Sequence, residues 1–108
     1  MPKNFDVGYL EQQDITLAMV IEAGLLKPGI TVYAASDNNI TGILNGDGSI
    51  ELVINGSKKI FPYPSGAARA VRNISVSGWI FWKVKEDGKL VELLRYKRQL
   101  QSLNEPKD

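Results

Sequence analysis

The chain has 108 residues, of which 44% are hydrophobic and 23% charged, and its formal net charge is +1. This length and composition are typical of one globular domain with a modest core. The absence of cysteine excludes disulfides and thiol nucleophiles, and the absence of histidine removes the commonest general base and metal ligand, so we expect a protein that is not an enzyme and binds no cofactor or metal.

The hydrophobic pattern argues against two further classes of protein. No apolar run approaches the roughly 20 residues that a membrane-spanning helix needs. The first residues, MPKNFDVGYLEQQD, lack the apolar stretch of a signal peptide. We therefore expect a cytoplasmic protein that has no membrane partner.

The N-terminal third is predicted to form one helix and one strand. Residues 1–13 show no clear periodicity and are expected to be a separate N-terminal segment. Asp14 can cap a helix that runs to about Ala23, where Gly24 is a suitable helix stop. A proline-glycine turn then precedes a β-rich run at residues 30–34.

The middle of the chain is predicted to form an antiparallel meander of three short strands. Asn55-Gly56 is the strongest hairpin signal, because both residues tolerate positive φ. The Asn-Gly-Asp-Gly run at residues 45–48 is a second turn, and a calcium loop is rejected there because the required acids are missing. The predicted strands are residues 40–44, 49–54 and 58–61.

A short helix with two arginines is predicted to follow the third strand. Two prolines end that strand, and Ser65 is expected to cap a helix over residues 66–72. Small alanines face the sheet, whereas Arg69 and Arg72, three residues apart, share the opposite face. The positive end of this helix is expected to aid phosphate contacts by these arginines.

The C-terminal third is predicted to form a strand and a helix. Residues 79–84 alternate as in a strand, which places Trp79 and Trp82 on opposite faces of the sheet. Asp87-Gly88 reads as a turn. A helix is expected over residues 90–103, with an apolar stripe of Leu93, Tyr96, Leu100 and Leu103.

These elements predict the fold class. We expect an α+β domain over residues 14–103, with a small antiparallel β-sheet, an N-terminal helix, a short Ser-capped helix and a C-terminal helix. The tail of residues 104–108 is expected to fray. No internal repeat is present.

The charges are distributed unevenly along the chain. Residues 1–51 carry two lysines against seven acids, whereas residues 52–85 carry six basic residues and no acid. A basic block beside exposed aromatic rings is typical of nucleic-acid binding, and the alternative is that these cations are solvated surface charges. The candidates for phosphate contacts are Lys58, Lys59, Arg69, Arg72 and Lys83.

Four other residues are candidates for shaping a base or groove contact: Ser65, Ser77, Trp79 and Trp82. An exposed tryptophan beside Lys83 can stack on a base, which contributes about 1–3 kcal/mol. The alternative is that the C-terminal helix covers the second face of the sheet, so that both rings are buried.

Four segments of the chain form a recognisable series: LAMVIEAGLLKPG at residues 17–29, ILNGDGSIELVINGSKKIF at 43–61, YPSGAARAV at 63–71 and SGWIFWKV at 77–84. In sequence and in order they resemble the RAMA family, the restriction enzyme and adenine methylase associated domain. The resemblance covers about Thr16 to Glu86.

The resemblance implies a non-catalytic DNA-binding module that is linked to restriction-modification and reads modified bases, with adenine methylation as the expected mark. Two positions depart from the family's pattern: Ser77 stands where Asn is usual, and Tyr63 where the first Ser of Ser-Pro-Ser is usual. If those side chains read a base, the specificity of this protein differs from that of its relatives.

An alternative function remains open. The chain can be a protein-interaction or self-association module that docks on a methylase, a nuclease or another defence partner. An exposed leucine stripe at Leu93, Leu100 and Leu103 would favour this alternative, because it would leave an apolar helix face without a partner.

Overall fold

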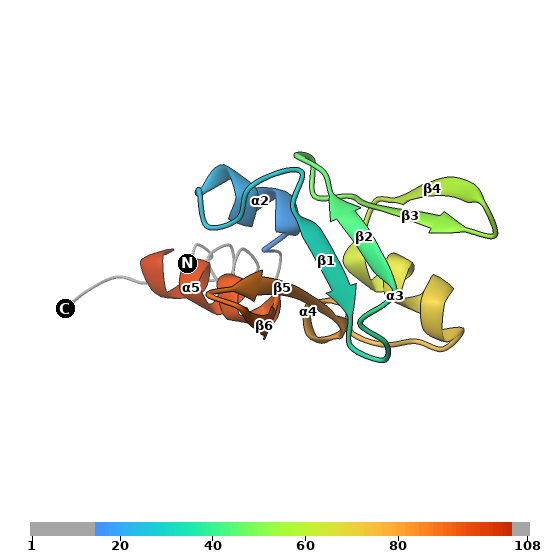
Figure 1. The fold of residues 1–108 in the computed structure, drawn as a ribbon. Coiled ribbons are helices and arrows are strands. Elements are labelled where there is room, and N and C mark those ends of the chain that lie inside the picture. The colour runs from blue at the N-terminus through green and yellow to red at the C-terminus, as the bar shows by residue number, and fades with distance from the viewer. Residues whose placement is uncertain (1–14, 105–108) are drawn as a thin grey trace.

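The computed structural model describes residues 15–104, so the predicted N-terminal segment, the Asp14 cap and the tail beyond residue 104 lie outside the described residues. The fold class is confirmed: one antiparallel sheet packs with helices in an α+β arrangement (Figure 1). The described helices are α2 (Leu17–Glu22), α3 (Pro64–Arg72), α4 (Gly78–Phe81) and α5 (Leu94–Asn104). The described strands are β1 (Thr31–Ala34), β2 (Thr41–Leu44), β3 (Ile50–Ile54), β4 (Ser57–Phe61), β5 (Trp82–Glu86) and β6 (Lys89–Glu92).

The sheet has the strand order β4-β3-β2-β1-β5-β6, and every neighbouring pair is antiparallel. The predicted meander is confirmed, because β2, β3 and β4 are neighbours in chain order. Asn55 and Gly56 adopt φ values of 52° and 81° between the paired residues Ile54 and Ser57, as a tight hairpin requires. After β4 the chain leaves the sheet through α3 and α4 and returns as β5 on the other side of β1 (Figure 1).

One face of the sheet is buried and the other is open. The cross-strand pairs Ala34–Trp82 and Leu44–Ile50 are buried, so these strands turn the same face towards the core. The helices complete a single hydrophobic cluster with Ala67, Ala68, Tyr96 and Leu100, and Leu93, just before α5, belongs to it as well. The open face carries the exposed side chains of Ile43, Val53 and Ile60. Because successive residues of a strand point to opposite faces, each exposed residue of the sheet lies on one of two separate surfaces.

The apolar stripe predicted for the C-terminal helix packs into the core. Leu93 is fully buried, and Tyr96 and Leu100 are almost so, whereas Leu103 is exposed. The stripe therefore gives no support to a leucine surface that docks on a partner.

Two helix starts differ from their predicted positions. The N-cap of α2 is Thr16, whose Oγ1 accepts a hydrogen bond from the backbone N–H of Met19 at 3.2 Å. The predicted Ser65 cap of α3 is wrong, because the helix begins one residue earlier at Pro64, with Tyr63 as the N-cap. Proline suits a first helical position, since its fixed φ is helical and the amide it lacks would have no partner. Ser65 thus keeps its hydroxyl free of a capping role.

The predicted strand over residues 79–84 is wrong in its first half. Gly78 to Phe81 form the helical turn α4, and β5 begins at Trp82. Trp79 and Trp82 therefore do not alternate across the sheet. The cause is tertiary packing that outweighs the strand-like pattern of aromatic residues.

The predicted C-terminal helix is wrong in its first residues. Asp87 and Gly88 adopt φ values of 54° and 81°, and they join β5 to β6 as a two-residue hairpin. Two successive positive φ values match the twist of paired strands, so residues 89–92 form a strand. The helix α5 then begins at Leu94.

Candidate nucleic-acid interface

The start of α3 is held in place by the Gly-Trp-x-x-Trp segment. The buried Trp82 donates its Nε1–H to the carbonyl oxygen of Pro64 at 3.0 Å. Gly78 lies so close that a Cβ built on it would be 2.3 Å from Pro64 C and from Ser65 N. Only a residue without a side chain allows this approach. The spacing of the motif thus has a structural reason: Gly78 admits the first turn of α3, and Trp82 anchors it.

A pocket of about 400 Å³ opens beside this junction. Its lining comes from the start of α2, the β2–β3 turn, the segment before and at the start of α3, and the start of α4. It brings together three of the residues predicted as base contacts, Ser65, Ser77 and Trp79. Tyr63, which departs from the family's pattern, also lines the pocket, and Asp47 is a lining residue that was not predicted. Pockets of this size take small molecules or single planar groups rather than a whole macromolecular surface.

The two tryptophans have different environments. Trp82 is fully buried, and its ring meets Phe81 edge to face at a centroid distance of 4.9 Å. Its ring therefore shapes the site from beneath and does not contact a base. Trp79 is half-buried, lines the pocket and has the Lys97 Nζ 5.2 Å from its ring centroid. Trp79 is thus the tryptophan that a ligand in the pocket can reach.

An exposed stripe of α3 leads away from the pocket. Ser65, Arg69 and Arg72 are spaced four and three residues apart, which places them on one face of the helix. All three are exposed, while Ala67 and Ala68 on the other side are buried. Both arginines lie in the last turn, at the negative end of the helix. The prediction that the positive end of the helix aids their phosphate contacts is therefore wrong.

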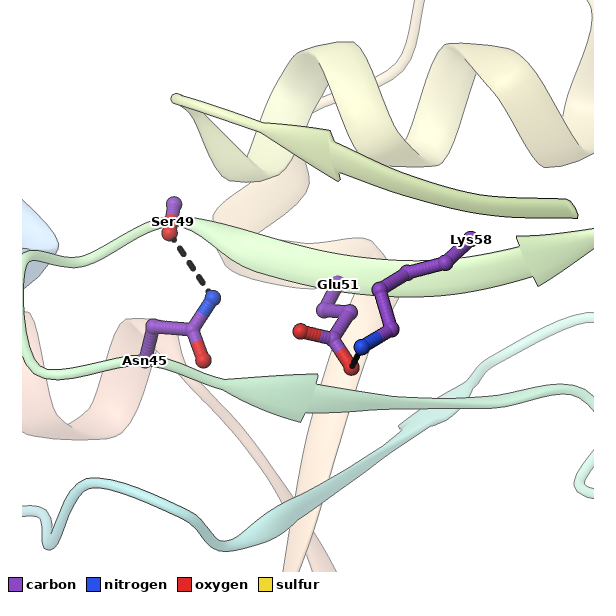
Figure 2. Close-up of polar contacts among 4 residues, drawn as sticks. All are labelled: Asn45, Ser49, Glu51 and Lys58. Carbon is purple, nitrogen blue, oxygen red and sulfur yellow. Dashed lines mark hydrogen bonds and ion pairs between the residues drawn. The ribbon is translucent and has the colours of Figure 1, made fainter.

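The five candidate phosphate contacts do not lie on one surface. The register pairs Val53 with Lys58 and Tyr33 with Lys83, so both lysines project from the open face of the sheet. Lys58 Nζ lies 3.7 Å from Glu51 Oε2 on that face (Figure 2). Lys59 alternates to the face on which α3 packs. The structure therefore groups Lys59, Arg69 and Arg72 with the helices and the pocket, and separates Lys58 and Lys83 from them.

Asp47 is a residue of the site that was not predicted from the sequence. Its Oδ1 accepts hydrogen bonds from the Ser49 backbone N–H at 3.0 Å and from Ser49 Oγ at 2.6 Å. Asn45 Nδ2 in turn donates to Ser49 Oγ at 3.0 Å (Figure 2). The side-chain bond from Ser49 is the main reason that the pKa of Asp47 falls below its ordinary value. The Asn-Gly-Asp-Gly run at residues 45–48 was the one sequence signal that pointed to Asp47, but it was interpreted only as a turn.

The rest of the described residues offer little other chemistry. Residues 15–104 hold no group of three or more His, Cys, Asp or Glu side chains that could bind a metal ion. No helix within the same residues is long and apolar enough to span a membrane.

Two comparisons with known proteins bear on this site. The family model described as Restriction Enzyme Adenine Methylase Associated matches residues 8–104, which is nearly the whole chain. The match includes every segment that lines the pocket. A comparison with curated proteins found no match.

Proposed function

Because the chain belongs to the RAMA family, we propose that it is a non-catalytic DNA-binding module that reads adenine methylation. The family is associated with restriction-modification systems. In such systems a nuclease and a methylase act on the same DNA sites. We therefore expect a domain that accompanies these enzymes to contact DNA. We also propose that the protein acts in the cytoplasm.

The observation that carries this proposal is the position of the pocket beside the arginine stripe of α3. Ser65 belongs to both, since it lines the pocket and shares a helix face with Arg69 and Arg72. Arginines can bind the phosphates of a DNA strand, while hydroxyl groups and an aromatic ring in a nearby hollow can contact a base. One surface thus offers both kinds of contact that a base reader needs.

We assign the phosphate contacts to Lys59, Arg69 and Arg72. These residues lie on the helix-bearing side of the sheet, together with the pocket. Lys58 and Lys83 project from the opposite face, so we propose that they do not contact the same stretch of DNA. Ser65, Ser77 and Trp79 contact the base, and the buried Trp82 supports them through Pro64.

We also propose that the module has no catalytic activity of its own. The family is one of associated domains rather than of catalytic ones. The chain has neither histidine nor cysteine, which supply most general bases and nucleophiles at neutral pH. Incubation of DNA with the protein and a divalent metal is expected to leave the DNA intact.

The test is binding to a fluorescent duplex, with and without N6-methyladenine, across a series of salt concentrations. Three phosphate contacts predict that log K falls with log salt with a slope of about −3. A difference in affinity between the two duplexes would support methylation reading. Affinity that does not change with salt, or no binding at low salt, would contradict the DNA-binding proposal.

One observation favours a second candidate function, docking on a protein of a restriction-modification system. The open face of the sheet exposes three aliphatic side chains on neighbouring strands, at Ile43, Val53 and Ile60, and Val53 is 71% exposed. Such a cluster is typical of an interaction surface. Gel filtration tests the self-association form of this candidate, and Val53→Lys with Ile60→Lys should abolish any dimer that it detects.

A further inference from the structure

The residues proposed to contact a base lie in a hollow and not on a projecting element. Ser65, Ser77 and Trp79 line the pocket of about 400 Å³. Reading bases within an intact duplex needs an element that projects into a groove, such as a helix or β-ribbon in the major groove, which is about 12 Å wide. A base that is paired inside the duplex cannot reach into a hollow. A base held by this pocket must therefore leave the stack, as it does in proteins that flip their target nucleotide.

Among the described residues that line the pocket, only Asp47 carries a charge. Its carboxylate accepts two hydrogen bonds from Ser49, which is 4% exposed. Ser49 in turn accepts a hydrogen bond from Asn45 (Figure 2). An ionised carboxylate accepts hydrogen bonds and donates none, and it has about four lone-pair sites. Two donors from Ser49 share Oδ1, so the group keeps capacity to accept another bond.

Building on the proposed function, we infer that the pocket takes one base turned out of the duplex and that Asp47 accepts a hydrogen bond from its exocyclic amino group. A carboxylate repels phosphate, so its partner in DNA is the neutral base. Adenine, cytosine and guanine carry an exocyclic amino group, and N6-methyladenine keeps one N–H on that group. Thymine has no exocyclic amino group, and its single N–H is on the ring, at N3, so it cannot donate to Asp47 from the exocyclic position.

The aromatic lining complements this selectivity. Trp79 and the exposed Tyr63 offer rings on which any base can stack, because every base has a π-face. Stacking therefore does not discriminate between bases. Asp47 is the pocket residue that separates bases with an amino group from thymine.

The first test uses the full chain and duplexes in which one target nucleotide stands opposite an abasic site. An unpaired base leaves the stack at a lower free-energy cost, so these duplexes should bind about tenfold more tightly than fully paired ones. Among the unpaired targets, adenine and N6-methyladenine should bind more tightly than thymine. Equal affinity for paired and unpaired targets would overturn the inference.

The second test compares Asp47→Asn with a matched control, Asp37→Asn. Asp37 Oδ1 accepts a bond from the Asn39 backbone N–H at 2.9 Å in another exposed loop, and Asp37 does not line the pocket. Both variants remove one negative charge, so any general gain in DNA affinity is the same. Asp47→Asn should reduce the preference for adenine over thymine about fivefold, because an amide also donates hydrogen bonds.

The outcomes separate this inference from the proposed function. Salt-sensitive DNA binding with equal preferences in Asp47→Asn and Asp37→Asn would overturn the role of Asp47 and leave DNA binding in place. No DNA binding at low salt would overturn both. If Asp47→Asn has a much lower melting temperature, the inference is tested on the unmodified chain instead, by comparing its affinities for unpaired adenine and unpaired thymine. Equal affinities for these two targets would overturn the inference.

Discussion

The indole Nε1–H of Trp82 donates a hydrogen bond to the carbonyl oxygen of Pro64 across 3.0 Å. Trp82 opens β5 next to the central strand β1, and Pro64 is the first residue of α3. This bond ties the sheet to the helix turn that presents Ser65 to the pocket. Trp82 is therefore a structural residue, and its loss should affect the site through the position of α3.

Trp82→Phe should lower the free energy of unfolding by about 2 kcal/mol or more. The change removes the bond to Pro64 and leaves a cavity where the larger ring was fully buried. Urea unfolding measures the difference. Trp79→Phe is the matched control, because Trp79 is only half-buried and makes no comparable bond among the described residues. Equal losses in the two variants would contradict the anchoring role of Trp82.

Gly78→Ala should be strongly destabilising despite the small size of the change. The added Cβ would lie 2.3 Å from backbone atoms of Pro64 and Ser65, which cannot move aside as a flexible side chain can. We expect a loss of about 3 kcal/mol in the free energy of unfolding.

Gly46→Ala provides the control for Gly78→Ala. Gly46 is not among the glycines with positive φ, and its added Cβ would lie 3.7 Å from Pro28, an ordinary contact. Its melting temperature should stay close to that of the unchanged chain. A Gly78→Ala variant that melts at the same temperature as Gly46→Ala would mean that α3 and α4 are packed less closely than described.

Local signals predicted most of the fold, and the errors lie where distant residues meet. The turns at Asn55-Gly56 and Asp87-Gly88 follow from the backbone preferences of the residues themselves. The helical turn at Gly78–Phe81 was missed, because its cause is the contact of Gly78 with Pro64, fourteen residues earlier. A pattern confined to neighbouring residues cannot contain that information.

The candidate site was predictable to a smaller extent than the fold. Ser65, Ser77 and Trp79 were singled out from the sequence, and they line one pocket. Asp47 was missed, since it lies outside the basic block and its turn had a sufficient local explanation. The basic block did not predict which cations share a surface. Lys58 and Lys83 lie on the open face of the sheet, because successive residues of a strand point to opposite faces.

The carboxyl of Asp47 should titrate below its ordinary pKa of 3.8, and Ser49→Ala should raise that pKa. The largest cause of the lowered pKa is the hydrogen bond from the Ser49 side chain. A lowered folded-state pKa contributes stability above the unfolded pKa, and this contribution is lost as pH falls through the folded value. The change of stability with pH that this carboxyl causes is therefore confined to pH values below about 4, and the full contribution is present above that pH. Carboxyl carbon chemical shifts followed by NMR measure the pKa directly, and an unchanged value in Ser49→Ala would contradict the assignment.

Removing both arginines of the α3 stripe should weaken DNA binding and its salt dependence. Arg69→Ala with Arg72→Ala eliminates two proposed phosphate contacts, so the slope of log K against log salt should become shallower by about 2. Both side chains are exposed, and alanine favours helix, so the melting temperature should change little.

The matched control for the arginine pair is Lys58→Ala with Lys83→Ala. It removes the same charge from the opposite face of the sheet, so it separates local contact from the general effect of net charge. A uniform long-range attraction would weaken equally in both double variants, whereas contact by the α3 stripe predicts a shallower slope only for the arginine pair. Equal slopes in the two variants would therefore move the interface away from α3, and a change confined to the lysine pair would place it on the open face of the sheet.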